Sequence, residues 1–389
     1  MTLFTVTEES LRDEDNTAEA ELIFKGSEEY TLGVELEFQL VDCKTLDLVS
    51  KADAILRDSA VKKRDRVVSE MWQSIIEVKT DICSSTHEVE KDLRNSVQIV
   101  EQAAQKQGCL LYSSGLHPFT LKERQKLSDG ERFQYTAEET QYVGNQYITQ
   151  GLHVHVGVKD GDTAVQVCDI MQAYLPLLLA LSASSPYFRG ADTGFHSYRT
   201  KLIEVLPIAG IAGFLGDWQR YVHETVLLKK AGMIKHFKDL RLDIRPNPEF
   251  GTVEIRICDS LSNFSETLGI IAMIQAMVVF IAENTLRSFP CSLQVMKGNK
   301  WQAARYGLAG QFVDSYGLLS ERTLPLRQAA DDLLHLLTPV VERFYSEEYI
   351  WRIYDMLQYG TDAEKQRLLI REGKDYKEMI FYFSNNYWK

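Results

Sequence analysis

Pairs of carboxylates and pairs of imidazoles recur at alternate positions in two short segments of the sequence. Glu35 and Glu37 are separated by one residue, and so are His153 and His155. In an extended strand, residues two apart lie on the same face, about 7 Å from each other. Carboxylates gathered this densely repel one another unless cations neutralise them, and oxygen ligands favour Mg²⁺ or Mn²⁺ over softer metals. The spacing therefore indicates a metal site on a sheet face.

Two later segments add arginines to the same pattern. Asp243 alternates with Arg245, and Glu254 alternates with Arg256. Guanidinium groups beside carboxylates suit phosphate or carboxylate ligands. Together with divalent cations they are the equipment for phosphoryl transfer, in which a protein positions groups and stabilises charge. The sequence has no GxxxxGK[ST], no GxGxxG, and no kinase-type HRD or DFG, so a nucleotide would bind on this sheet face.

The elements that carry these residues are short segments with clean alternation of apolar and polar side chains. Val34, Leu36 and Phe38 share one parity in the first of them, opposite Glu35 and Glu37. Parallel strands covered on both faces read as continuous apolar runs, so this alternation favours a single antiparallel sheet. The predicted strands are 32–41, 74–80, 152–158, 241–245 and 252–258.

Helical patterns fall between the predicted strands. They cover residues 86–106, 164–182, 217–229, 265–286 and 323–344. Thr86 is the expected N-cap of the first of these helices. The predicted fold class is α+β, with helices packed on the apolar face of the sheet and a concave polar face left open.

Composition narrows the classes of partner. The 389 residues carry 43 basic and 55 acidic side chains, a net charge of −12. This deficit of cations argues against nucleic-acid coating and polybasic membrane docking. Residues 1–29 hold nine acids against Arg12 and Lys25. We interpret residues 1–29 as an acidic N-terminal extension outside the main core, and residues 30–389 as a single catalytic domain.

Cysteines and apolar runs bear on the compartment. Six cysteines occur at positions 43, 83, 109, 168, 258 and 291, with no CxxC pair, which indicates reduced thiols. The most apolar stretch, 270–282, lies between Glu266 and Glu283, leaving sixteen uncharged residues. That is short of the roughly 20 that a spanning helix needs, so we predict a buried core helix. No secretory signal is visible, and we expect a soluble protein of the reducing cytoplasm.

Six segments in a fixed order resemble a known family. They are GVELEFQLV (33–41), GLHVHVGV (151–158), SASSPYFRG (182–190), DIRP (243–246), VEIRICD (253–259) and WQAARYG (301–307). Together they resemble the bacterial carboxylate–amine ligases of the type 2 glutamate–cysteine ligase family, over about residues 30–310. The resemblance implies an ATP-dependent ligase on a glutamine-synthetase-like sheet. Such an enzyme activates a carboxylate, here the γ-carboxyl of glutamate, as an acyl phosphate that the amine of cysteine or another amino acid attacks.

The resemblance also implies roles for particular residues. The implied ligands of Mg²⁺, or of Mn²⁺, are Glu35, Glu37, Glu70, Glu77, His153 or His155, and Glu254. The implied ATP-binding residues are Lys79, Arg245 and Arg256. The implied substrate-binding residues are Arg189, Tyr198 and Arg199. Among these, the residues expected to be catalytic are Glu35, Arg245 and Arg256.

Some positions depart from the family pattern, and two other functions stay open. Asp81 stands where a glycine is common, and Gly298 where an acid often precedes the asparagine, so the amine acceptor is left undetermined. The His-x-His pair also fits a zinc-dependent amidohydrolase, although the Glu-x-Glu strand would then go unexplained. The third possibility is a non-catalytic binding protein on a ligase scaffold. A homodimer is the default assembly.

Overall fold

The computed structural model describes residues 22–121, 125–284 and 286–389. Its centre is a seven-stranded sheet. The strands are, in spatial order, β10 (Ile244–Asn247), β11 (Thr252–Ile255), β5 (Leu152–Gly157), β1 (Leu32–Asp42), β3 (Ile75–Lys79) and β2 (Val67–Ser69), with β4 (Cys109–Tyr112) paired to the second half of β1. Every pairing in this sheet is antiparallel. The predicted antiparallel sheet is therefore confirmed.

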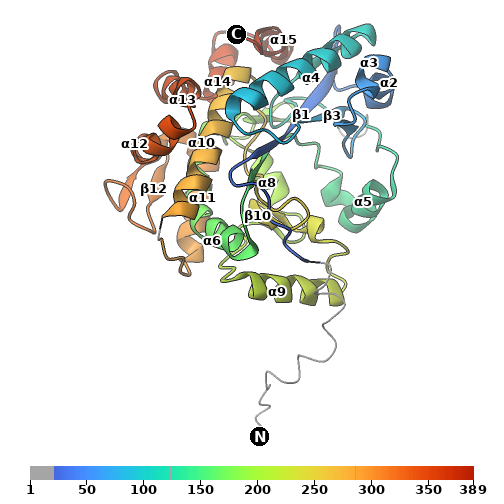
Figure 1. Ribbon diagram of the computed structural model, residues 1–389. Coiled ribbons are helices and arrows are strands. Elements are labelled where there is room, and N and C mark those ends of the chain that lie inside the picture. The colour runs from blue at the N-terminus through green and yellow to red at the C-terminus, as the bar shows by residue number, and fades with distance from the viewer. Residues whose placement is uncertain (1–21, 122–124, 285) are drawn as a thin grey trace, which may run out of the picture.

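The apolar face of the sheet is covered by three helices. Val34, Leu36 and Phe38 of β1 are at most 1% exposed. Against this face pack α4 (Thr86–Lys106), α6 (Gly161–Met171) and α10 (Phe264–Glu283), and Figure 1 shows α4 and α10 crossing the sheet. By length and composition α10 could cross a membrane, but 89% of its apolar window is buried inside the protein. The predicted core helix is confirmed, and the fold class is α+β.

Three predicted helix boundaries differ from the structure. The single helix expected over 164–182 is two helices, α6 and α7 (Leu175–Ser182), bent by 65°, with Pro176 in the first turn of the second. Proline is tolerated there because the first-turn N–H has no intrahelical partner. The helix expected from residue 323 begins only at α12 (Leu326–Arg343), after a short strand. The N-cap of α4 is Ser85 and not Thr86, since the Ser85 hydroxyl accepts from the Glu88 N–H at 3.3 Å.

Shorter elements and a C-terminal helical group complete the chain. Figure 1 shows α12 to α15 gathered beside α10. The remaining elements are α2 (Ala52–Leu56), α3 (Ser59–Lys62), α5 (Glu131–Gly144), β6 (Tyr187–Phe188), β7 (Ala191–Asp192), α8 (Arg199–Ile203), β8 (Ala209–Gly210), α9 (Trp218–Lys230), η3 (Phe237–Asp239), β9 (Arg241–Leu242), α11 (Leu293–Tyr306), η4 (Gly307–Ala309), β12 (Gln311–Val313), β13 (Thr323–Pro325), α13 (Glu347–Tyr359), α14 (Asp362–Arg371) and α15 (Tyr376–Asn386).

The described part of the N-terminal extension begins at Leu22 and packs on the domain. Leu22 is buried in a cluster with Val222 and Val226 of α9. Gly26 has a φ of 65°, and a Cβ there would lie 2.5 Å from the Lys159 carbonyl oxygen, so only glycine fits this close approach. Ser27 Oγ donates to the Gly251 carbonyl at 2.9 Å and Lys25 N–H to the Pro248 carbonyl at 3.5 Å, so residues 25–27 lie against the turn between β10 and β11. The greater part of the predicted acidic extension, residues 1–21, lies outside the described residues.

Candidate active site

Cross-strand register brings the polar positions of separate strands next to one another. Glu35 on β1 lies opposite Lys79 on β3 and opposite His153 on β5. Glu37 lies opposite Glu77. Because strand residues alternate between faces, these side chains all point to the face that the helices leave uncovered.

The same register extends to the other end of the sheet. Glu254 on β11 lies opposite His155 on β5 and opposite Arg245 on β10. The resulting row of side chains lines a cleft of about 340 Å³. Of the predicted site residues, ten line it: Glu35, Glu37, Glu70, Glu77, Lys79, His153, His155, Arg245, Glu254 and Arg256.

Four glutamates gather at the β1–β3 end of the cleft. Ligand atoms of Glu37, Glu70 and Glu77 lie within 4.8 Å of one another, as do those of Glu35, Glu77 and His153. The only ammonium drawn into this cluster among the described residues is that of Lys79, whose Nζ lies 3.0 Å from Glu35 and 2.7 Å from Glu77. One ammonium against four carboxylates leaves an excess of negative charge.

The pKa values of three of these four acids reflect that excess, whereas contacts with His153 and Lys79 lower the pKa of Glu35. Burial, and then the negative charge of Glu77, raise the pKa of Glu37 to about 8. Burial, and then the charge of Glu37, raise the pKa of Glu70 to about 7. Burial also raises the pKa of Glu77 well above its usual value, and the charges of Glu35 and Glu70 add to this. Buried like charges oppose ionisation in this way when too few cations are beside them, so the donor set fits a hard divalent cation.

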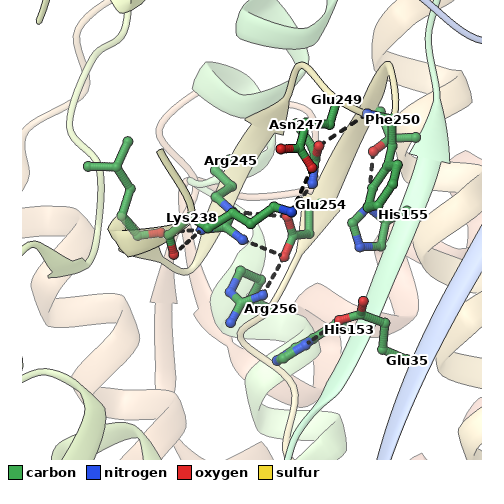
Figure 2. A network of polar contacts seen from close by, with 12 residues as sticks. Glu35, His153, His155, Lys238, Arg245, Asn247, Glu249, Phe250, Glu254 and Arg256 are labelled. Carbon is green, nitrogen blue, oxygen red and sulfur yellow. Dashed lines mark hydrogen bonds and ion pairs between the residues drawn. The ribbon is translucent and has the colours of Figure 1, made fainter. Parts of the chain in front are cut away.

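The β10–β11 end of the cleft is different, because its single acid is surrounded by cations. Arg245 Nε donates to Glu254 Oε2 at 2.9 Å, and Arg245 Nη2 donates to Oε1 at 3.0 Å. Asn247 Nδ2 donates to Oε2 at 3.0 Å, and Arg256 Nη1 also donates to Oε1 (Figure 2). Burial would raise the pKa of Glu254, but Arg245 and Arg256 hold it well below its usual value.

This arrangement bears on the predicted role of Glu254. Both of its oxygens are occupied by donors from the chain itself, and neither group of potential metal ligands includes it. The structure therefore places Glu254 in the same cleft as the other predicted metal ligands but outside both converging groups. Its place is that of a carboxylate that orients two arginines.

The two histidines occupy distinct positions. His153 Nδ1 lies 3.2 Å from Glu35 Oε2, and burial together with Arg256 lowers the pKa of His153 to about 4. His155 Nδ1 lies 3.0 Å from the Thr252 hydroxyl, and its ring meets Phe250 edge-on at 5.6 Å between centroids (Figure 2). Only His153 belongs to a group of potential metal ligands among the described residues, so the structure separates the two histidines that the sequence left as alternatives.

Arg199 borders a small pocket that continues from the cleft past Tyr147 and His153. It is 3% exposed, donates to the backbone carbonyls of Ile257 and Arg256, and lies 3.6 Å from Asp259. Much of its guanidinium is thus committed to holding the chain that follows β11.

Arg189 and Tyr198 do not line the cleft. Arg189 has a φ of 51° in the turn of the β6–β7 hairpin, its guanidinium lies over the Phe188 ring, and it borders a separate small pocket with His117. Tyr198 packs against Phe188 and Phe195. The structure therefore separates these two predicted substrate residues from the rest of the predicted site.

Several lining residues were not predicted from the sequence. Arg132, Phe133 and Thr136 of α5 form one wall, and Arg241 and Asn247 lie near the arginine end. Asn247 had a usable signal, because it lies two positions after Arg245 on the same strand and so shares its face. The α5 residues had none, since that segment carries no alternating pattern.

Solved structures with a similar fold include two from glutathione biosynthesis enzymes of bacteria. A glutamate–cysteine ligase from Francisella tularensis, crystallised with AMP, is similar with a TM-score of 0.69, at 14% identity, over 92% of this chain and 88% of that chain. A bifunctional glutathione synthetase from Pasteurella multocida gives a TM-score of 0.66, at 14% identity, over 95% of this chain and 54% of that chain. The fold and the charged cleft define the class: an ATP-dependent carboxylate–amine ligase, as the sequence predicts.

Sequence comparison gives the family within that class. The model of the glutamate–cysteine ligase family 2 matches residues 31–374, and the chain belongs to this family. A relative from Thermobifida fusca, named "Putative glutamate--cysteine ligase 2", is 36% identical over 92% of this chain and 90% of its own length. A relative of the same name from Solibacter usitatus is 34% identical over 90% and 92%. Neither alternative, the zinc hydrolase or the non-catalytic binding protein, is supported by these matches.

Proposed function

We propose that this enzyme joins the γ-carboxylate of glutamate to the amine of cysteine or a related amino acid, with ATP converted to ADP and phosphate. Support comes from the family and from the names of its relatives and structural neighbours, including the AMP complex of the Francisella tularensis enzyme. The observation that carries the proposal is the pairing, in one cleft, of a carboxylate cluster in need of cations with arginines suited to anions.

We propose Mg²⁺ as the cation of the carboxylate cluster. Its ligands would be Glu37, Glu70 and Glu77 on one side, and Glu35, Glu77 and His153 on the other, the two groups that converge in the structure. The imidazole of His153 also makes Mn²⁺ acceptable. When bound, the cation supplies neutralisation of phosphate charge. Lys79, predicted from the sequence to bind ATP, would neutralise Glu35 and Glu77 until the cation enters.

The two arginines of the opposite end would have different tasks. Arg245 donates to Glu254 and to the carbonyls of Lys238 and Leu240, so its donors are engaged within the protein and it acts by positioning Glu254. Within the described residues, the Arg256 guanidinium donates a hydrogen bond to Glu254 alone, and its side chain is 22% exposed. We propose that Arg256 binds the phosphate that passes to the substrate carboxylate, where charge develops.

The direct test is ADP release from ATP, Mg²⁺ and glutamate, with each of the twenty amino acids supplied as acceptor. We expect release that depends on both glutamate and an acceptor, with cysteine among the active ones, and a γ-glutamyl product in the mass spectrum. Absence of glutamate-dependent ADP with every acceptor would remove glutamate as the substrate.

The setting that we propose is the reducing cytoplasm, with a homodimer as the assembly. All six cysteines are unpaired, and four of them are buried. Disulfides are rare in a reducing compartment, and this pattern of thiols agrees with it. Size-exclusion chromatography with light scattering would give the assembly.

A further inference from the structure

A second cleft, of about 600 Å³, lies apart from the sheet face. It is formed by the β6–β7 hairpin and the residues after it, the C-terminal end of α11, and helices α14 and α15. None of its lining residues also lines the sheet cleft. The side chains that matter for its chemistry are Tyr187, His196, Arg305, Arg367, Arg371 and Tyr376.

Three arginines give this cleft a local excess of positive charge in a protein of net charge −12. Two acids also line it, but both are engaged. Asp192 forms a two-point ion pair with Arg367, at 2.8 and 3.3 Å. Glu364 accepts the Thr361 N–H at 2.8 Å in the capping box of α14. Among the described residues, neither Arg305 nor Arg371 forms an ion pair with an acid.

Two of the three guanidinium groups, those of Arg367 and Arg305, are held in place before any ligand arrives. Arg367 also donates to the Phe195 carbonyl at 2.8 Å, so three bonds fix it. Arg305 donates to the Gly194 carbonyl and lies over the Tyr306 ring, 5.0 Å from its centroid. Groups fixed in advance lose less conformational freedom on binding, which favours affinity.

The pKa of His196 depends on burial and on the charged groups of the cleft. Burial, and then the charge of Arg367, lower the pKa of His196 to about 4. The charge of Arg305 acts in the same direction. The charges of Glu364 and Asp192 act in the opposite direction, so burial is the main reason why the imidazole is neutral at pH 7.

We propose that this cleft binds a small multivalent anion, with carboxylate or phosphate groups, at a site separate from the catalytic cleft. Arg305 and Arg371 would meet the anion, because planar guanidinium groups bind carboxylate and phosphate oxygens through paired hydrogen bonds. Arg367 holds the hairpin side of the cleft through Asp192. The rings of Tyr187 and Tyr376, with centroids 5.1 Å apart and planes tilted by 60°, also line the cleft.

The test is calorimetric titration of the full-length protein at constant ionic strength with two probes, inorganic pyrophosphate and citrate. We expect saturable binding of at least one probe, and the tighter one tells phosphate from carboxylate recognition. Arg371→Gln and Arg305→Gln should each raise the Kd of that probe about tenfold, as expected for loss of one charge-assisted hydrogen bond. Arg327→Gln, an exposed arginine of α12 outside the cleft, is the matched control and should leave the Kd unchanged.

A further variant separates this site from the catalytic cleft. In Arg256→Ala, binding of the same probe should persist with an unchanged Kd. Loss of binding in Arg256→Ala, an unchanged Kd in Arg371→Gln, or no saturable binding of either probe would each overturn the proposal. Because Arg371 is exposed and without an ion-pair partner in the described residues, its replacement leaves folding intact, and thermal melting verifies this.

Discussion

The two ends of the polar sheet face treat a buried glutamate in opposite ways. Glu77 is 3% exposed and Glu254 is 1% exposed. Burial, and then the charges of Glu35 and Glu70, raise the pKa of Glu77 well above its usual value. At Glu254 two arginines outweigh burial, and its pKa is well below the usual value. Residue type and burial are alike, so the difference comes from the neighbours.

The contrast indicates which buried carboxylates are neutralised by side chains of the protein and which need protons or added cations. Glu254 has its full set of donors in Arg245, Asn247 and Arg256, so this end is complete in the protein alone. Among the described residues, Lys79 supplies the one ammonium or guanidinium group that pairs with the acids of the carboxylate end, so their remaining charge must be met by protons or by added cations. The carboxylate end of the cleft is thus suited to a metal cation, and the arginine end is suited to a phosphate.

The largest expected effect is that of Glu77→Gln, because Glu77 belongs to both groups of potential metal ligands. We expect Mg²⁺-dependent ADP formation to fall by about 100-fold or more, with the fold kept, since an amide fills the same space. Steady-state assays and circular dichroism measure the two. Glu321→Gln, at an exposed position, is the control. Wild-type turnover in Glu77→Gln would remove the metal assignment from this end.

The next largest effects should differ between Arg245 and Arg256 at the other end of the cleft, one variant losing stability and the other losing turnover. Arg256→Ala is expected to lower turnover by about 100-fold with little change in stability. Arg245→Met removes the two-point partner of a buried carboxylate and should cost about 3–5 kcal/mol of stability. Urea unfolding and steady-state kinetics on both variants make the comparison. If both variants lost only stability, Arg256 would be structural as well.

The local part of this site was predictable from the sequence. Strand alternation has a period of two, so the shared face of Glu35 with Glu37, and of His153 with His155, follows from spacing alone. The antiparallel sheet followed from the same alternation. Glu70 was placed only by the resemblance, since it lies just beyond the end of β2.

What the sequence could not predict depends on register and on chain paths. Both carboxylate oxygens of Glu254 accept hydrogen bonds only because Arg245 lies directly across from it on the neighbouring strand. No local sequence pattern specifies that pairing. Arg189 was grouped with the substrate residues by the resemblance, but the β6–β7 hairpin carries it to another pocket.

A smaller effect is expected from Lys79→Met, which increases the difference in charge between the carboxylate end and the arginine end of the cleft. Without the ammonium that bridges Glu35 and Glu77, the carboxylate end carries one more uncompensated charge. Affinity for Mn²⁺, measured from free Mn²⁺ by paramagnetic resonance, should rise about tenfold. Lys297→Met, an exposed lysine of α11, should leave it unchanged. Weaker binding in Lys79→Met would mean that Lys79 supports the cation site and does not compete with it.

The smallest expected effect comes from His117, which lies at neither end of the cleft. Its contribution to the pH dependence of stability must be subtracted before the pH dependences of the two ends are compared. His117 is 4% exposed, its Nε2 lies 2.9 Å from the Leu46 carbonyl oxygen, and its Nδ1 accepts from the Thr120 N–H at 3.0 Å. Both contacts fit the neutral ring, with Nε2 donating. Burial lowers the pKa of His117 to about 4.

Since the unfolded chain binds this proton with a pKa of about 6.5, the stability due to neutral His117 is complete above that pH and is lost as the pH falls toward 4. Between pH 7.5 and 5.5 the loss is about 1 kcal/mol. His117→Gln keeps one donor and one acceptor but does not titrate, so urea unfolding should show a pH dependence weaker by that amount. An equal pH dependence of unfolding in the two proteins would show that His117 does not make the protein sensitive to acid. The loss of stability at low pH would then come from other histidines and acids, including His153 at the cleft.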